Sequence, residues 1–174
     1  MRKNPIVPRP ARKASEGSGK SRDAGSGKAL RPAGVVSGQI HGAATKAAAV
    51  RLSPRKLIEI IRVGLPVREL DELRLSLDLP MDKLAPRLGI SRATLHRRKA
   101  QGRLDPEESD RVLRFARLMG RAVEVMEGEE PARRWLTSPQ IGLGGAVPLD
   151  YAKTEVGARE VEDLLGRIEY GVYS

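Results

Sequence analysis

The chain has 174 residues and a formal net charge of +10, with no cysteine, one phenylalanine and one tryptophan. The absence of cysteine excludes disulfides, thiolate metal sites and cysteine nucleophiles, and it suits a reducing compartment, so we expect a cytoplasmic protein. The sequence has no run of about 18 apolar residues, the length that a membrane-spanning helix needs. Because the core must be aliphatic, a composition typical of packed helices, we predict an all-α helical bundle.

Residues 1–50 form a basic leader that holds ten Lys or Arg and two Asp or Glu, and therefore +8 of the net charge of +10. The leader is rich in Gly, Pro, Ser and Ala and shows no apolar period, so it cannot bury enough surface to offset the entropy cost of ordering. We predict that it is disordered. Two roles remain open: a solubilising leader, or a basic arm that adds salt-dependent contacts to DNA phosphates.

Order is predicted to begin at Ser53, a hydroxyl N-cap that precedes Pro54 at the first position of a helix. An apolar stripe follows on one face of that helix. Gly64 ends it, and Pro66 begins a second helix that runs to about Leu77.

The stretch 84–98 has the pattern of a helix-turn-helix. Ala85 is small where two helices cross, Gly89 allows the positive φ of a tight turn, and Ser91 caps the second helix. Pro86 lies inside the first helix, which we expect to be kinked there. The second helix carries the side chains that we predict to contact DNA in the major groove: Ser91, Arg92, Thr94, His96, Arg97, Arg98 and Lys99. The alternative is an ordinary helical corner with a solvated basic face.

A long helix is predicted from Asp105 to about residue 127, because an aspartate N-cap precedes Pro106 and two glutamates. Its apolar seam is either intrachain core or a dimer contact, and the former is favoured because two heptads are too few for a coiled coil: Val112, Ala116, Met119, Val123 and Met126. Pro131 opens a further helix, residues 138–148 form a loop, and a last helix spans about 155–169.

Residues 51–174 resemble the Xre/MbcA/ParS antitoxin family. The resemblance is carried by residues 88–91, 94–98 and 104–114 in the first half. In the second half it is carried by Trp135-Leu136, residues 143–145 and 148–150, Thr154-Glu155-Val156-Gly157 and residues 161–173. The C-terminal pattern is more specific than the helix-turn-helix. The resemblance implies an Xre-like helix-turn-helix domain over 51–103 and a small helical toxin-binding domain over 104–174.

The resemblance also implies the partners. Members of the family neutralise a RES-domain toxin that consumes NAD, covering its active site with the antitoxin's C-terminal region. They repress their own operon through the helix-turn-helix and form dimers within toxin–antitoxin complexes. We expect no cofactor and no metal. The candidate toxin contacts lie toward the chain end, where adaptable aromatic and apolar side chains follow the last helix: Arg159, Arg167, Glu169, Tyr170, Gly171, Val172, Tyr173 and Ser174.

Three alternatives compete with these expectations. The chain-end aromatic residues could instead fold back onto Trp135 and the core. The protein could be a stand-alone transcriptional regulator whose C-terminal half mediates dimerisation. An enzyme is disfavoured, because the only histidines are His41 in the leader and His96 in a basic helix, which leaves no triad and no histidine metal cluster.

Overall fold

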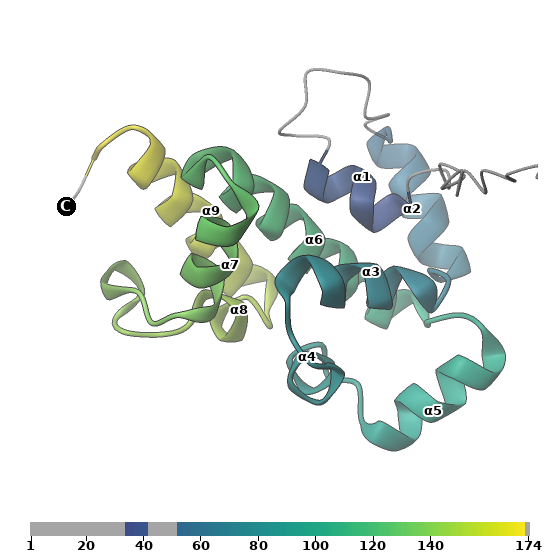
Figure 1. The fold of residues 1–174 in the computed structure, drawn as a ribbon. Helices are drawn as coiled ribbons and strands as arrows, with labels where there is room; N and C mark the ends of the chain where they lie inside the picture. Colours follow the sequence, from purple (N-terminus) through teal and green to yellow (C-terminus); the bar gives the residue numbers. More distant parts are fainter. Residues whose placement is uncertain (1–33, 42–51, 173–174) are drawn as a thin grey trace, which may run out of the picture. The chain divides into compact units, whose positions relative to one another are not determined.

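The computed structural model describes residues 34–41 and 52–172, and within these ranges it contains nine α-helices, one 3₁₀ turn and no strand (Figure 1). The predicted all-α fold is therefore confirmed. In chain order the elements are α1 (Val35–His41), α2 (Pro54–Val63), α3 (Arg68–Leu77), α4 (Met81–Arg87), α5 (Arg92–Gln101), α6 (Pro106–Met126), α7 (Glu129–Thr137), η1 (Ile141–Leu143), α8 (Pro148–Tyr151) and α9 (Glu155–Glu169). No helix in the described ranges is long and apolar enough to cross a membrane.

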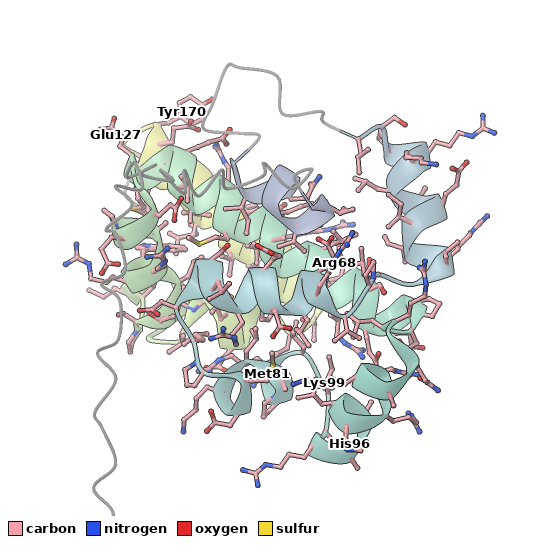
Figure 2. All side chains as sticks on the ribbon, turned by 45° about the vertical axis from the view of Figure 1, so that its right-hand side comes forward. Arg68, Met81, His96, Lys99, Glu127 and Tyr170 are labelled. Atoms are coloured by element: carbon pink, nitrogen blue, oxygen red, sulfur yellow. The ribbon has the colours of Figure 1, made fainter. Side chains whose placement is uncertain are left out.

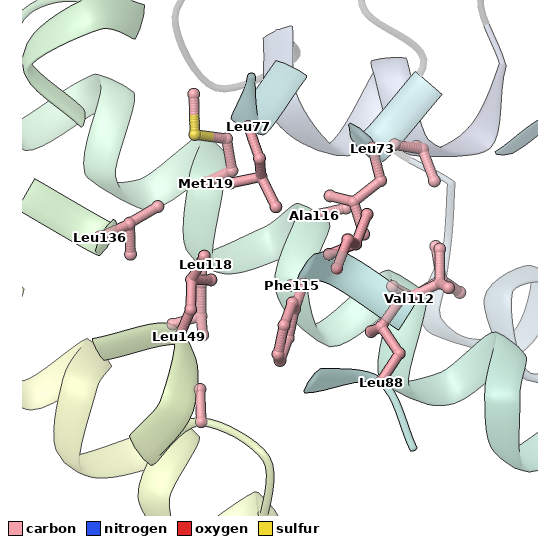
Figure 3. Packing of buried hydrophobic residues seen from close by; sticks show 14 of the residues in the cluster. Leu73, Leu77, Leu88, Val112, Phe115, Ala116, Leu118, Met119, Leu136 and Leu149 are labelled. Carbon is pink, nitrogen blue, oxygen red and sulfur yellow. The ribbon is translucent and has the colours of Figure 1, made fainter. Parts of the chain in front are cut away.

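Helix α6 is the central element of the fold. It begins with a capping box, in which the Asp105 side chain accepts the Glu108 N–H at 2.7 Å and the Glu108 side chain accepts the Asp105 N–H at 2.9 Å. It packs against α1, α2, α3, α7 and α9. Its predicted seam is intrachain core, because Val112, Ala116, Met119 and Val123 are buried and Met126 packs at the edge. Figure 3 shows Val112, Ala116 and Met119 among the buried side chains.

Helix α1 corrects the prediction for the leader, because it lies inside the segment that was predicted to be disordered. The side chains of Val36 and Ile40 are fully buried in the core. The carboxylate of Glu69, itself buried, accepts the N–H of Val36 at 2.9 Å. Two apolar residues four positions apart are too short a pattern to predict a helix from the sequence alone. A helix this short is not stable in isolation, so its stability comes from burial against α3 and α6. Of the predicted leader, residues 1–33 and 42–50 lie outside the described residues.

The predicted helix-turn-helix is formed by α4 and α5. Gly89 has a φ of +68° in the turn between them, a backbone conformation that favours glycine. Ile90, directly after the turn, is buried in the core and anchors the start of α5. Pro86 lies in the last turn of α4, where its missing N–H deprives only the Asp82 carbonyl of a helical partner, and its predicted kink stays a prediction.

The elements after α6 complete the bundle. Leu136 of α7, Leu149 of α8, and Val161 and Leu165 of α9 are fully buried. The last helix has the predicted bounds. Because α6 contacts helices from both halves of the chain, the same core supports the helix-turn-helix and the C-terminal helices. The predicted boundary between residues 103 and 104 remains a prediction.

Candidate functional site

The first candidate site is the exposed side of α5. Its first turn is fixed by Ser91, whose Oγ accepts the N–H of Thr94 at 3.1 Å and donates to the Thr94 Oγ1 at 2.9 Å. No residue of α5 is buried, and its strongest contact among the helices is with α4. The helix therefore leaves most of its surface free for a partner.

Most of the predicted DNA contacts lie on this free surface. The side chains of Arg92, His96, Arg97 and Lys99 are exposed, and Thr94 is half-buried. Figure 2 shows His96 on the outer side of α5. The first turn of α5 carries no acidic residue. The combination of a surface helix, a positive N-terminal end and exposed cations can attract phosphate and present side chains to base edges.

Arg98 differs from its neighbours because its guanidinium group is bound within the protein. Its Nε donates to Glu108 at 2.7 Å, its Nη2 to Asp105 at 2.5 Å and its Nη1 to Gln101 at 3.0 Å. The hydrogen bond to Glu108 raises the pKa of Arg98 above its ordinary value, although burial opposes the rise. Only 15% of the Arg98 side chain is exposed. Arg98 joins the end of α5 to the capping box of α6, so its guanidinium group, unlike those of its predicted neighbours, is not free to contact DNA.

The second candidate site is the end of α9 and the segment after it. The Val172 N–H bonds to the Arg167 carbonyl at 2.9 Å, and the Gly171 N–H to the Ile168 carbonyl at 3.2 Å, with Gly171 at a φ of +66°. These two bonds form a Schellman motif, which turns the chain back across the helix end. The segment up to Val172 is therefore held in one conformation by its own backbone.

An ion pair fixes the last turn of α9 to α6. Both Nη atoms of Arg121 donate to the carboxylate of Glu169, and the hydrogen bond raises the pKa of Arg121 above its ordinary value. Glu169, a candidate toxin contact, thus has an internal partner. The pair is partly exposed, and it links the chain end to the central helix.

The remaining candidate toxin contacts differ in exposure. Tyr170 is 79% exposed and Val172 is 53% exposed, so Tyr170 does not fold back onto Trp135 and the core. Arg159 is exposed and forms an ion pair with Glu155 at 3.4 Å, whereas Arg167 is half-buried. Tyr173 and Ser174 lie outside the described residues.

One exposed apolar residue beside the chain end was not predicted. Ile141, the first residue of η1, is 98% exposed. The glycine-rich sequence around it indicated only a loop, and no sequence pattern distinguishes an exposed isoleucine in a loop from one that is tucked under it. Within the described ranges, no group of three or more His, Asp or Glu side chains is placed to hold a metal ion.

Comparison with known proteins matches each half of the chain to a domain family. Residues 56–117 match the family model described as the antitoxin Xre-like helix-turn-helix domain. Residues 121–171 match the one described as the antitoxin Xre/MbcA/ParS C-terminal toxin-binding domain. The first contains α5, and the second contains η1 and the end of α9.

Curated relatives agree with the family models. The chain is 40% identical over 120 residues to Antitoxin Xre of Yersinia enterocolitica. This match covers 68% of this chain and 81% of the relative. It is 34% identical over 117 residues to Antitoxin Xre of Photorhabdus laumondii, covering 66% of this chain and 79% of the relative. It is 29% identical over 134 residues to the Prs ADP-ribosylating antitoxin of a Sphingobium species. This match covers 71% of this chain and 84% of the relative. The chain belongs to the Xre/MbcA/ParS family of antitoxins, a non-enzymatic family that combines an Xre-like helix-turn-helix with a toxin-binding domain.

Proposed function

We propose that this protein is the antitoxin of a type II toxin–antitoxin system that neutralises a RES-domain toxin and represses its own operon. The observation that carries the proposal is the presence of two separate surfaces on one helical unit: the exposed basic side of α5 and the apolar chain end after α9. Figure 2 shows His96 and Tyr170, one from each surface, on opposite sides of this unit. A toxin on one surface therefore leaves the other free for DNA.

The proposed DNA contacts are those predicted residues of α5 whose side chains reach the surface, with the capping serine: Ser91, Arg92, Thr94, His96, Arg97 and Lys99. In this arrangement the first turn reads base edges, and the later cations contact phosphates. The operator is double-stranded DNA. We further propose that the protein acts as a homodimer within the toxin–antitoxin complex, since two-fold symmetric operators match two-fold symmetric readers.

The proposed toxin contacts are at the chain end. Tyr170 and Val172 are held by the Schellman motif, so little conformational entropy is lost when they enter a concave site. We propose that Arg159, Arg167, Gly171, Tyr173 and Ser174 complete the contact, and that Glu169 mainly keeps the end of α9 in place through Arg121. Covering the active site then excludes the toxin's substrate.

The proposed toxin chemistry is the consumption of NAD. One of the similar proteins is named for the ADP-ribosylation of Prs, and ADP-ribosylation draws its ADP-ribose from NAD. This name supports a toxin partner that consumes NAD. Both partners, DNA and toxin, would be met in the cytoplasm.

The test is co-expression with the adjoining open reading frame, which the proposal expects to encode the RES-domain toxin. We expect the toxin gene alone to stop growth and lower cellular NAD, and co-expression to restore both and to yield a co-purifying complex. A duplex from the promoter should bind the purified chain with an affinity that falls steeply as salt rises, because phosphate contacts release counterions. A chain that binds the promoter but neither associates with the RES-domain protein nor restores growth would be a stand-alone regulator.

A further inference from the structure

A groove lies beside the chain end, between η1 and the last two turns of α9. Its volume is about 470 Å³. The walls are apolar and come from Ile141, Leu164, Ile168 and Val172, with Gln140 and Arg167 as the polar lining. Because Val172 also belongs to the proposed toxin contact, the groove is continuous with that surface.

The exposed wall of the groove is held in place by its neighbours. The Gln140 N–H bonds to the Ala146 carbonyl at 3.0 Å, and the Gln140 Nε2 donates to the Trp135 carbonyl at 2.8 Å. Leu143, at the other end of η1, is buried in the core. Ile141 is therefore presented to solvent by a fixed turn, and together with the exposed Val172 across the groove it makes an apolar surface of the kind that marks a protein contact.

The polar lining gives the second observation. The Nε of Arg167 is buried, and no described group accepts its hydrogen bond. A buried donor without an acceptor is costly, and natural proteins pair such groups. An occupant that supplies a carboxylate or carbonyl oxygen would satisfy this donor while its apolar side chain fills the groove.

We propose that this groove is a second contact site for the toxin, in addition to the chain end, and that Ile141 is one of its anchors. The occupant is a toxin segment that carries an apolar side chain next to an acidic or carbonyl oxygen, which meets Arg167. The proposal rests on the proposed function. The toxin is favoured as occupant because every lining residue except Val172 lies within the matched toxin-binding domain, and Val172 is shared with the chain end.

The test is Ile141→Ser in the full chain, with the purified RES-domain protein that the proposed function expects from the adjoining open reading frame as the probe. Because an exposed residue can be truncated without disturbing the core, the melting temperature and operator affinity should equal those of the wild type. Toxin affinity should fall by about tenfold or more, the typical cost of losing an interface anchor. The matched control is Val156→Ser, which removes an apolar residue that is 73% exposed at the other end of α9 and should leave affinity unchanged.

A second variant tests the polar part of the groove. Arg167→Met keeps most of the side-chain volume but removes the buried donor, so it should weaken toxin binding without lowering the melting temperature. If the wild-type chain does not bind the RES-domain protein, the proposed function fails as well. If the wild type binds and Ile141→Ser binds equally well, only the groove proposal is overturned. A lower melting temperature of free Ile141→Ser would also overturn it, because the isoleucine would then contact the chain's own residues.

Discussion

Two neighbouring arginines on α5 have opposite environments. Successive side chains on a helix are rotated by about 100°, so Arg97 faces solvent while Arg98 faces the start of α6. Arg98 lies between the carboxylates of Asp105 and Glu108. Its position is therefore structural, whereas that of Arg97 is suited to a partner outside the chain.

Alanine at each position should separate the two roles. We expect Arg97→Ala to keep the melting temperature and to weaken operator binding by about 1–3 kcal/mol, the usual cost of a lost contact from a recognition helix. Arg98→Ala should lower the melting temperature by several degrees, because it leaves the nearly buried Glu108 carboxylate without its cation. Thermal unfolding measures the melting temperature, and a DNA titration at one fixed salt concentration measures the operator affinity.

Arg134→Ala serves as the control, since it removes an arginine that is 73% exposed on α7 and distant in sequence from α5. It should change neither quantity appreciably. Equal losses of stability in Arg97→Ala and Arg98→Ala would contradict the assignment of roles.

The sequence predicted a basic helix at α5 but not which of its basic side chains face solvent and which face the protein. Which arginine faces inward depends on Asp105 and Glu108, and the sequence pattern explains these two carboxylates completely as the cap and first turn of the next helix. Their second role, binding Arg98, arises only when the turn at Gly102 brings the helices together. The capping itself was predictable, because it involves residues three positions apart.

At the scale of elements, α1 depends most on tertiary contacts. It is a short helix whose stability comes from the burial of Val36 and Ile40, and it sits against α6 where Gly120 has no side chain. A Cβ built at Gly120 would lie 2.4 Å from the Gln39 carbonyl oxygen. The two helices can touch only because this position is a glycine. A leader that is unremarkable in sequence thus contributes to the core, which no local pattern could reveal.

Gly120→Ala should displace α1. Because the obstructing atom belongs to the backbone and cannot rotate away, we expect a loss of about 1–3 kcal/mol in the free energy of unfolding, typical of overpacking. Hydrogen exchange should show lost protection over residues 35–41 while α9 keeps its protection.

Gly166→Ala is the matched control in another helix. Its added Cβ meets nothing within 4 Å, so it should be neutral or slightly stabilising. If Gly120→Ala retains protected α1 amides and wild-type stability, α1 does not pack on α6 as described.

For the molecule as a whole, α6 joins two surfaces with different tasks. Its start binds Arg98 of the helix-turn-helix, and its last turns carry Arg121, which holds the end of α9. The Arg87–Asp150 pair, at 3.1 Å, adds a link between α4 and α8. Burial raises the pKa of Asp150, but the hydrogen bond from Lys153 and the charge of Arg87 outweigh this and hold the pKa below its ordinary value. The helix-turn-helix and the chain end thus share one scaffold, whereas each uses its own surface to contact a partner.

The sequence predicted most of this architecture. Caps and apolar periods predicted the helices of the second half, whereas the chain end was expected to contact a toxin mainly because of the family resemblance. The groove could not be predicted, because it depends on the packing of a glycine-rich turn against α9. The exposure of Ile141 and the unpaired Arg167 donor are consequences of that packing.

The most direct test of the central claim is a parallel titration of two variants against operator duplex and RES-domain toxin. We expect Arg92→Ala/Arg97→Ala to lose operator affinity and keep toxin affinity. A chain that ends at Glu169 should do the opposite, because the anchors at Tyr170 and Val172 are gone while α5 is untouched. If both variants keep the wild-type melting temperature yet lose both affinities to the same extent, the two surfaces do not act separately and the account is wrong.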